Sequence, residues 1–453
     1  MAESSRVPDS HVGNGDGLVR AIGPRLLLLF IIGDMLGTGI YVRVGAVAGE
    51  VGGAVWVAFL VAFILAALTA CAYAELVGKY PRAAGAALYA NRAFRNPFFS
   101  FMVAFAVVCS GLASASAAAL AFGGDYLAVF VSLPSLLVAI LFVAVLSAIN
   151  FIGISESLKT NLVLTLIELS GLLLIIVVGI VAFSDGSAQP ARSFTFSTEG
   201  VAALAVLTGA STAFYALVGF EDSVNVAEET ENPSRTFPRA LFGGILIVGI
   251  VYLLVSFTAT MVVDPARLGG PEGGDAPLAL VLLEGPLAFP PALFSVIALV
   301  AITNTALANL IMGSRVLYGM AREGVMPSIF GRAHRTRHTP WVAIVFVALV
   351  MVGLISTGDV GDLADTTVVL LLLVFTVVNV AVLVLKRDRV DHDHFSAPSF
   401  IPIIAIVVTL VLLVQQEADI FLRAAILLGF GLLLYIVNFA AKRILDHRNP
   451  EAR

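Results

Sequence analysis

Residues 27–49 read LLLFIIGDMLGTGIYVRVGAVAG, an apolar run long enough to cross a membrane that is interrupted by Gly33, Gly37 and Gly39. A helix that crosses a bilayer needs about 20 mainly apolar residues, because lipid offers no hydrogen-bond partner to a free backbone amide. Glycines in the middle of such a run indicate a helix that breaks where protein surrounds it or where it lines a cavity. The stretch therefore predicts a spanning helix with a break near its centre.

The rest of the chain has the composition of a membrane protein. Of its 453 residues, 59% are hydrophobic and 13% are charged, and the mean hydropathy is +1.00. Soluble domains are about 45–50% apolar and about 25% charged. We expect an all-α integral membrane protein with twelve spanning helices. They are predicted at 26–47, 54–74, 98–122, 134–154, 160–183, 201–227, 240–263, 291–316, 341–356, 366–385, 400–414 and 420–440.

The basic residues predict the orientation of these spans. If the N-terminus lies inside the cell, 22 of the 26 Lys and Arg residues fall in cytoplasmic segments, and only Arg43, Arg192, Arg267 and Arg423 fall outside. Cytoplasmic loops of membrane proteins carry such an excess of positive charge. We therefore expect both termini in the cytoplasm, with the protein in the inner or plasma membrane of the cell. Residues 1–20 are polar and read as a disordered cytoplasmic tail rather than a signal peptide.

The sequence excludes several classes of function. All six histidines lie in the tails or in predicted loops, and the chain has no HExxH, GxSxG or Gly-rich phosphate-loop motif. We therefore expect no enzyme, no cofactor, no resident metal and no nucleic-acid partner. The expected partners are membrane lipid and a small-molecule substrate that moves with an ion gradient.

A second interrupted span predicts where that substrate binds. Residues 208–229 read TGASTAFYALVGFEDSVNVAEE, with Gly219 in the middle of the sixth predicted helix. Broken helices at corresponding places in two halves of a chain point to a substrate site at the midplane. Amides around Gly37, Thr38 and Gly39 would face a carboxylate, and carbonyl groups near Gly219 would face an ammonium. The alternative is that these glycines only form close contacts between helices.

Acidic residues inside the apolar runs are the next candidates. An acid near the centre of a spanning helix costs about 2.5–3.5 kcal/mol to insert and is rarely without a role. Asp34, Glu168, Glu221 and Asp222 are in this position. Glu168 is our first candidate for a proton-coupling acid and Glu221 the second. Asp34 could line a cation site or cap the exposed amides, and Glu168 could instead be an acid bonded to a neighbouring helix.

The eighth predicted span is unusually rich in side-chain oxygens. It contains Thr303, Asn304, Thr305, Asn309 and Ser314. Such groups either complete a cation site beside the first helix or hold helices together. The candidate cation site consists of Gly33, Leu36, Asn304, Thr305 and Asn309. Glu75, which precedes a basic cytoplasmic loop, is predicted to form a structural or gating ion pair.

Four stretches together resemble the amino acid-polyamine-organocation superfamily of permeases. They are GDMLGTGIY at 33–41, YAELVGKYPRAAGAALYANRAF at 73–94, FYALVGFEDSVNVAEETENPSRTFPRA at 214–240, and SRVLYGMAREGVMP at 314–327 followed by TPWVAI at 339–344. The resemblance implies an inverted repeat of five plus five helices, with the first and sixth helices broken, and two extra C-terminal helices. The repeats would cover about 26–183 and 201–385 and the extra helices about 400–440, all within one transporter domain at 21–453.

The resemblance also implies roles for individual residues. By position, Gly37, Thr38, Gly39 and Ile40 match the turn that binds a substrate carboxylate. Gly219, Phe220 and Glu221 match the turn of the sixth helix, where the aromatic residue usually acts as a gate. Counted from the GISES segment at 153–157, Glu168 falls where several relatives that take cationic amino acids carry a lysine. A glutamate there could take up a proton or help to hold a cation.

These observations predict a secondary transporter that imports an amino acid by proton symport and alternating access. Because of the extra acids, a cationic amino acid and an amine without a carboxylate stay as alternative substrates. The alternatives are an exchanger of amino acids, amines or polyamines, a sodium-coupled symporter, a channel, and a receptor that binds the substrate without transporting it.

Overall fold

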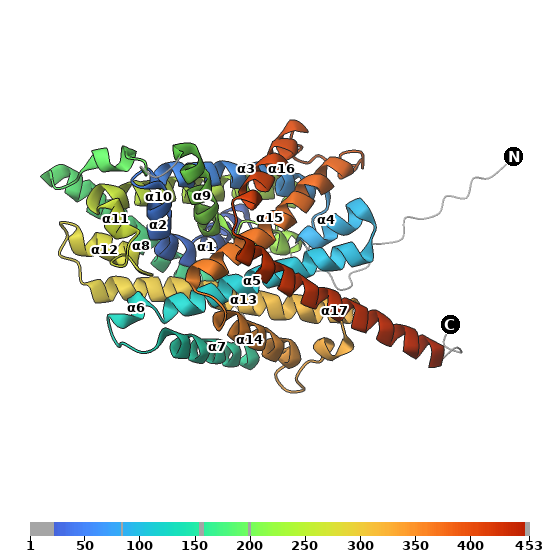
Figure 1. Ribbon diagram of the computed structural model, residues 1–453. Helices are drawn as coiled ribbons and strands as arrows, with labels where there is room; N and C mark the ends of the chain where they lie inside the picture. Colours follow the sequence, from blue (N-terminus) through green and yellow to red (C-terminus); the bar gives the residue numbers. More distant parts are fainter. Residues whose placement is uncertain (1–21, 83–84, 154–157, 198–200, 449–453) are drawn as a thin grey trace.

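The computed structural model describes residues 22–82, 85–153, 158–197 and 201–448, and the regular secondary structure of this part is helical, with two isolated backbone bridges (Figure 1). The longer helices are α1 (Pro24–Met35), α2 (Thr38–Val51), α3 (Val55–Lys79), α5 (Pro97–Phe122), α7 (Ser135–Ile152), α8 (Leu158–Asp185), α9 (Ala202–Phe214), α10 (Pro233–Val262), α13 (Pro291–Arg322), α14 (Trp341–Ile355), α15 (Val360–Leu385), α16 (Phe400–Val414) and α17 (Ala418–Arg448). The short ones are α4 (Gly85–Phe94), α6 (Asp125–Ala128), α11 (Pro265–Leu268), α12 (Pro277–Glu284) and the 3₁₀ turns η1 (Pro190–Phe194), η2 (Tyr215–Leu217), η3 (Asp222–Glu229) and η4 (Ser328–Gly331).

The described helices have the lengths and composition of membrane spans. Nine helical segments of the described chain are long and apolar enough to cross a bilayer, of which Pro97–Ala128 joins α5 to α6 and Ala202–Glu229 joins α9 to η3. With their bend of 45°, α1 and α2 together would make a tenth span. The helices α14 and α16 are apolar but shorter. Ten of the twelve predicted ranges each fall on a single helix, whereas 26–47 covers α1 and α2 and 201–227 covers α9, η2 and part of η3. The count of twelve spans, the inverted repeat and the domain bounds stay predictions, and the predicted tail at 1–20 lies outside the described residues.

Local sequence signals explain where several helices begin. Proline occupies the first turn of α1, α5, α10 and α13, where its missing amide hydrogen would have no partner in the helix. Asp359 accepts a hydrogen bond from the amide of Asp362 at 2.8 Å and so caps α15. Because of this cap, α15 begins at Val360, six residues before the predicted start of that span at 366.

The helices surround a centre that consists of α5, α13 and α15. In Figure 1, α5 and α13 run side by side through the middle of the molecule, and both α13 and α15 pack against α5. In an apolar 18-residue stretch of α15, 67% of the residues are buried, compared with 17% in such a stretch of α17. The outer surface is apolar, since Phe183 of α8 and Val414 of α16 are 67% and 81% exposed. Such exposed apolar side chains are expected where helices contact lipid.

A buried ion pair joins α3 to α15. Glu75 of α3 is fully buried, and Lys386, just after α15, donates to its two carboxylate oxygens at 3.1 and 2.9 Å. The Lys79 ammonium lies 3.8 Å from the same carboxylate, and the amide of Ala397 donates to it at 2.9 Å. The ion pair predicted for Glu75 is therefore present, and it fixes the end of α3 to the end of α15 and to the linker that follows.

We expect Glu75→Ala to lower the free energy of unfolding by about 3–5 kcal/mol, because it leaves two largely buried ammonium groups without their counter-ion. Thermal unfolding of the purified protein in detergent measures this loss as a lower Tm. The matched control Glu417→Ala changes an exposed glutamate and should leave Tm unaltered. Equal unfolding temperatures for Glu75→Ala and the unmodified protein would contradict the structural role.

Two acidic residues lie close together where α6 begins and just before α12. The amide of Asp275 donates to the carboxylate of Asp125 at 2.9 Å. Burial of the Asp275 side chain, together with the negative charge of Asp125, raises the pKa of Asp275 to about 6. In the unfolded chain the pKa of an aspartate is about 3.9. The folded protein therefore holds this proton more tightly than the unfolded chain does, and its stability decreases as the pH rises from about 4 to about 6.

Asp275→Asn should remove this part of the pH dependence, because an amide does not titrate. We expect the Tm of the unmodified protein to fall relative to that of the variant as the pH rises from 4 to 7. Asp419→Asn, at an exposed position, serves as the control. If the profiles of Asp275→Asn and the unmodified protein run parallel, the assignment to Asp275 is wrong.

Candidate functional site

The first break separates α1 from α2 at Leu36 and Gly37. The carbonyl oxygen of Met35 accepts a hydrogen bond from the Tyr252 hydroxyl of α10 at 2.8 Å. The amide of Thr38 donates to Oγ1 of Thr305 in α13 at 3.2 Å. Side chains of two other helices therefore satisfy backbone groups that lose their partners within the helix.

The second break separates α9 from η3. After η2 the backbone is extended at Val218, and Gly219 has φ = +125°, a conformation that side-chain-bearing residues rarely adopt. The amide of Gly219 donates to Oε2 of Glu221 at 2.9 Å, and the amide of Asp222 donates to the carbonyl of Gly219 at 3.0 Å. Glu221 therefore stabilises the turn that precedes it.

The two breaks contact each other. A Cβ atom on Gly219 would collide with the carbonyl oxygen of Asp34, and one on Gly39 would collide with the backbone of Ala216. Similarly, a Cβ atom on Gly37 would meet the side chain of Thr305. Glycine is required here because the interrupted segments approach through their backbones.

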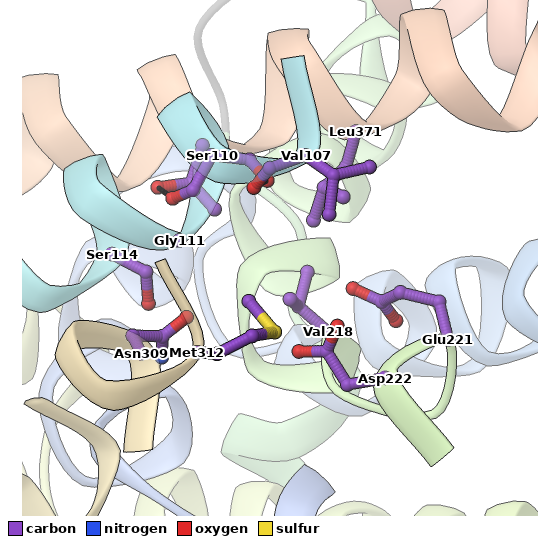
Figure 2. A pocket seen from close by; sticks show the side chains of 11 residues that line it. Val107, Ser110, Gly111, Ser114, Val218, Glu221, Asp222, Asn309, Met312 and Leu371 are labelled. Atoms are coloured by element: carbon purple, nitrogen blue, oxygen red, sulfur yellow. Dashed lines mark hydrogen bonds between the residues drawn. The ribbon is translucent and has the colours of Figure 1, made fainter. Parts of the chain in front are cut away.

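A cavity lies beside the second break (Figure 2). Its free volume is about 10 Å³, which is room for about one water molecule. Its lining comes from α5, the second break, α13 and α15, and consists of Val107, Ser110, Gly111, Ser114, Val218, Glu221, Asp222, Asn309, Met312, Thr367 and Leu371. In Figure 2 the carboxylates of Glu221 and Asp222 extend from the second break toward the space that Ser114, Asn309 and Met312 face. The cavity thus combines two acids with neutral polar and apolar groups.

Most of the predicted substrate residues do not line this cavity. Of the seven, only Glu221 belongs to the lining. Thr38, Ile40 and the glycines of the first break are buried away from it. Phe220 is fully buried and packs its ring on Tyr73 and Phe375, with ring centroids 5.9 and 5.4 Å apart.

The candidate coupling acid Glu168 lies at a separate junction. Its side chain is fully buried in α8, and Nδ2 of Asn304 in α13 donates to its Oε1 atom at 2.9 Å. The hydroxyl of Tyr41 in α2 donates to the backbone carbonyl of Glu168 at 2.6 Å. A Cβ atom on Gly33 would collide with Thr165, one turn before Glu168. Four of the helices that carry predicted residues therefore meet here, namely α1, α2, α8 and α13.

The remaining predicted residues lie around these two places. The backbone of Asp34 touches the second break, as described above. Asn309 lines the cavity, so the structure separates it from Asn304, which contacts Glu168. Leu36 is buried at the first break, and Thr305 binds the amide of Thr38. The structure therefore does not gather the predicted cation-site residues around one point.

An ion pair joins the first broken helix to α15. Arg43 of α2 donates to Asp365 of α15 at 2.7 Å, and the Arg43 residue is 7% exposed. Asp365 precedes the cavity residue Thr367 by two positions and Leu371 by six. Because Glu75 binds Lys386 beyond the opposite end of α15, this helix is held at both ends with its cavity residues between.

Sequence reasoning missed most of the cavity lining. Ser110, Gly111 and Ser114 belong to the run CSGLASAS of α5, where small and hydroxyl-bearing residues recur at helical spacing. That run is the signal that could have identified this wall. Thr367 directly follows Asp365 and Thr366 where the apolar run of α15 begins, and no helical spacing of polar residues singles it out.

Comparison with known proteins gives a consistent result. The sequence model of the amino acid permease family matches residues 22–428. The branched-chain amino acid permease BcaP of Bacillus subtilis (strain 168) is 27% identical over 93% of this chain and 93% of its own length. The chloroplastic cationic amino acid transporter 9 of Arabidopsis thaliana is 30% identical over 71% of this chain and 59% of its own length. The low-affinity putrescine importer PlaP of Escherichia coli (strain K12) is 26% identical over 72% of this chain and 74% of its own length.

The contact between the breaks gives a direct test. Gly39→Ala should destabilise the protein by about 1–3 kcal/mol, because its methyl group would overlap the backbone of Ala216. Gly353→Ala in α14 is the matched control, since no atom lies within 4 Å of its added Cβ. We expect the Tm in detergent to fall for Gly39→Ala and not for Gly353→Ala. A Gly39→Ala protein with unchanged Tm would show that the two breaks are not tightly packed.

Proposed function

Because this chain belongs to the amino acid permease family, we propose that it is a secondary active transporter that imports an amino acid or a related amine together with a proton. The observation that carries the proposal is the contact of two interrupted helices beside a cavity that contains carboxylates. Broken helices in transporters provide a substrate site about which one group of helices can move against another. Alternating access around the cavity is therefore the proposed mechanism.

We assign proton coupling to Glu168. Its carboxylate accepts a hydrogen bond from Nδ2 of Asn304, and Oδ1 of Asn304 is buried without a hydrogen-bond partner among the described residues. An amide can donate a hydrogen bond to a carboxylate through its nitrogen or, once rotated, accept a hydrogen bond from the neutral acid through its oxygen. Asn304 can therefore stabilise Glu168 in both protonation states. The Tyr41 hydroxyl connects the backbone of Glu168 to α2, so a shift of α8 would reach the first break.

The other predicted coupling groups have different surroundings. Glu221 accepts a hydrogen bond from the amide of Gly219, and this carboxylate also lines the cavity. We therefore propose that Glu221 acts mainly as a substrate contact and that its role in coupling is secondary. Asp34 touches the second break through its backbone carbonyl, and we propose that it responds to movement of that break.

A sodium-coupled version is the second candidate, and one observation favours it. Oδ1 of Asn304 and Oγ1 of Thr38 are buried oxygens without hydrogen-bond partners among the described residues. In transporters with broken helices, oxygen groups near the breaks, chiefly backbone carbonyls, coordinate sodium. Saturable uptake that persists in sodium-free choline buffer would exclude this version, and uptake that requires substrate inside the vesicles would indicate an exchanger.

We also propose an orientation. We place both termini in the cytoplasm and the protein in the plasma membrane. In this orientation, 22 of the 26 basic residues lie on the inner side. Arg43 and Asp365 then lie toward the outside, and Glu75 and Lys386 toward the cytoplasm. The cavity residues on α15 lie between these two ion pairs.

Glu168→Gln tests the coupling assignment. We expect the variant to lose accumulation driven by an inward proton gradient in proteoliposomes, because glutamine cannot take up a proton, while substrate binding remains measurable. Glu417→Gln changes an exposed glutamate and should accumulate substrate as the unmodified protein does. Concentrative uptake by Glu168→Gln at the unmodified rate would refute the assignment.

A further inference from the structure

Five exposed arginines follow one another from the end of α13 to the start of α14. They are Arg315, Arg322, Arg332, Arg335 and Arg337, and together they are called the arginine surface below. Glu323 is the one acidic residue between positions 315 and 338. Within the described part of the chain none of the five guanidinium groups forms an ion pair, whereas Arg43, Arg267 and Arg423 do. The positive charge of this surface is therefore almost uncompensated by the protein.

The loop that carries three of these arginines is fixed to neighbouring helices. Oγ1 of Thr339 donates to the carbonyl of Phe151 in α7 at 2.9 Å, and the His334 ring packs on the ring of Phe151 with centroids 5.1 Å apart. Nearer to α13, Nδ2 of Asn438 in α17 donates to the carbonyl of Gly324 at 2.9 Å. The arginines are therefore presented by a folded platform.

The end of α13 contributes an open position to this platform. Gly331 of η4 packs against that end, since an added Cβ atom would lie 3.6 Å from Cβ of Ala321. Arg315, Gly319 and Arg322 occupy positions i, i+4 and i+7 and so share one face of the helix. No other described group lies within 4 Å of a Cβ atom added to Gly319. The face thus has an unfilled place between two arginines.

Helix length and flanking residues place this surface at the level of the lipid headgroups. A helix of 32 residues, such as α13, is about 48 Å long, whereas the hydrocarbon core of a bilayer is about 30 Å thick. The last turns of α13 therefore extend beyond that core. Trp341 at the start of α14 is 41% exposed, and Ile329 of η4 is 46% exposed. Tryptophan is typical of the membrane–water interface.

We propose that the arginine surface binds the headgroups of anionic phospholipids, with one phosphate lying over Gly319 between Arg315 and Arg322. A guanidinium group donates two parallel hydrogen bonds to phosphate oxygens, and clusters of arginine beside a spanning helix attract anionic lipids. Phosphatidylcholine has the same phosphate but carries its own ammonium, so it does not compensate the surface. The preference of basic residues for one side of the membrane explains their number there but not their gathering on a fixed surface without counter-ions.

Native mass spectrometry of the purified full-length protein in detergent tests the lipid preference. The probe is an equimolar mixture of phosphatidylglycerol and phosphatidylcholine with identical acyl chains. We expect at least about fivefold more phosphatidylglycerol than phosphatidylcholine to remain bound. Equal retention of the two lipids would overturn the proposal.

Two double variants of equal charge place the lipid on this surface. Arg315→Gln/Arg322→Gln should lower retention of phosphatidylglycerol at least about fivefold, because both phosphate partners are lost. Arg387→Gln/Arg389→Gln removes two exposed arginines from the linker after α15 and should leave retention unaltered. Equal losses in the two double variants would show that net charge alone attracts the lipid and would overturn the assignment.

A third variant keeps every charge and fills the open position. Gly319→Leu should lower retention of phosphatidylglycerol at least about threefold, because its side chain occupies the place of the phosphate. Gly353→Leu in α14 is the matched control, since Gly353 also has open space beside it and lies outside the arginine surface. Unchanged retention by Gly319→Leu would overturn the placement of the headgroup on α13.

Discussion

The structure depends on the need to satisfy backbone groups where two helices break at membrane depth. An unpaired amide or carbonyl group in lipid costs several kcal/mol, so each break requires neighbours that supply partners. Tyr252 and Thr305 do this at the first break, and Glu221 does it at the second. These bonds fix α10 and α13 against the breaks. The glycines allow the broken segments to touch through their backbones, which leaves the cavity between the second break, α5, α13 and α15.

The helix α15 connects this centre to both surfaces. Arg43 and Asp365 join it to α2 at one end, and Glu75 and Lys386 join it to α3 at the other. Thr367 and Leu371, which line the cavity, lie between these contacts. Movement of α15 away from α2 must separate the first ion pair, and movement of its other end away from α3 must separate the second. Both ion pairs are intact in this structure.

The sequence was sufficient for the helices and the breaks but not for the cavity. Runs of apolar residues locate the spans, and Gly37 and Gly219 locate the breaks because few other residues fit there. Glu168 was identifiable because an acid in an apolar helix needs a partner, although nothing in the chain indicated that Asn304 would be that partner. Thr305 shows the limit most clearly. Its contact with the Thr38 amide joins positions 267 residues apart and decides whether that amide is open to a ligand. Helical spacing alone cannot supply such a contact, because α13 is apolar on several faces.

In the proposed mechanism the cavity opens alternately to the two sides of the membrane. The most direct measurement labels a single cysteine introduced by Ser114→Cys, in a protein whose Cys71 and Cys109 are replaced by alanine, with a membrane-impermeant thiol reagent applied to one side of proteoliposomes at a time. Alternating access predicts labelling from each side, with substrate and an imposed gradient shifting reactivity from one side to the other. Labelling from one side only under every condition would contradict it and would support a receptor. Equal, unshifted labelling from both sides would contradict it in favour of a channel.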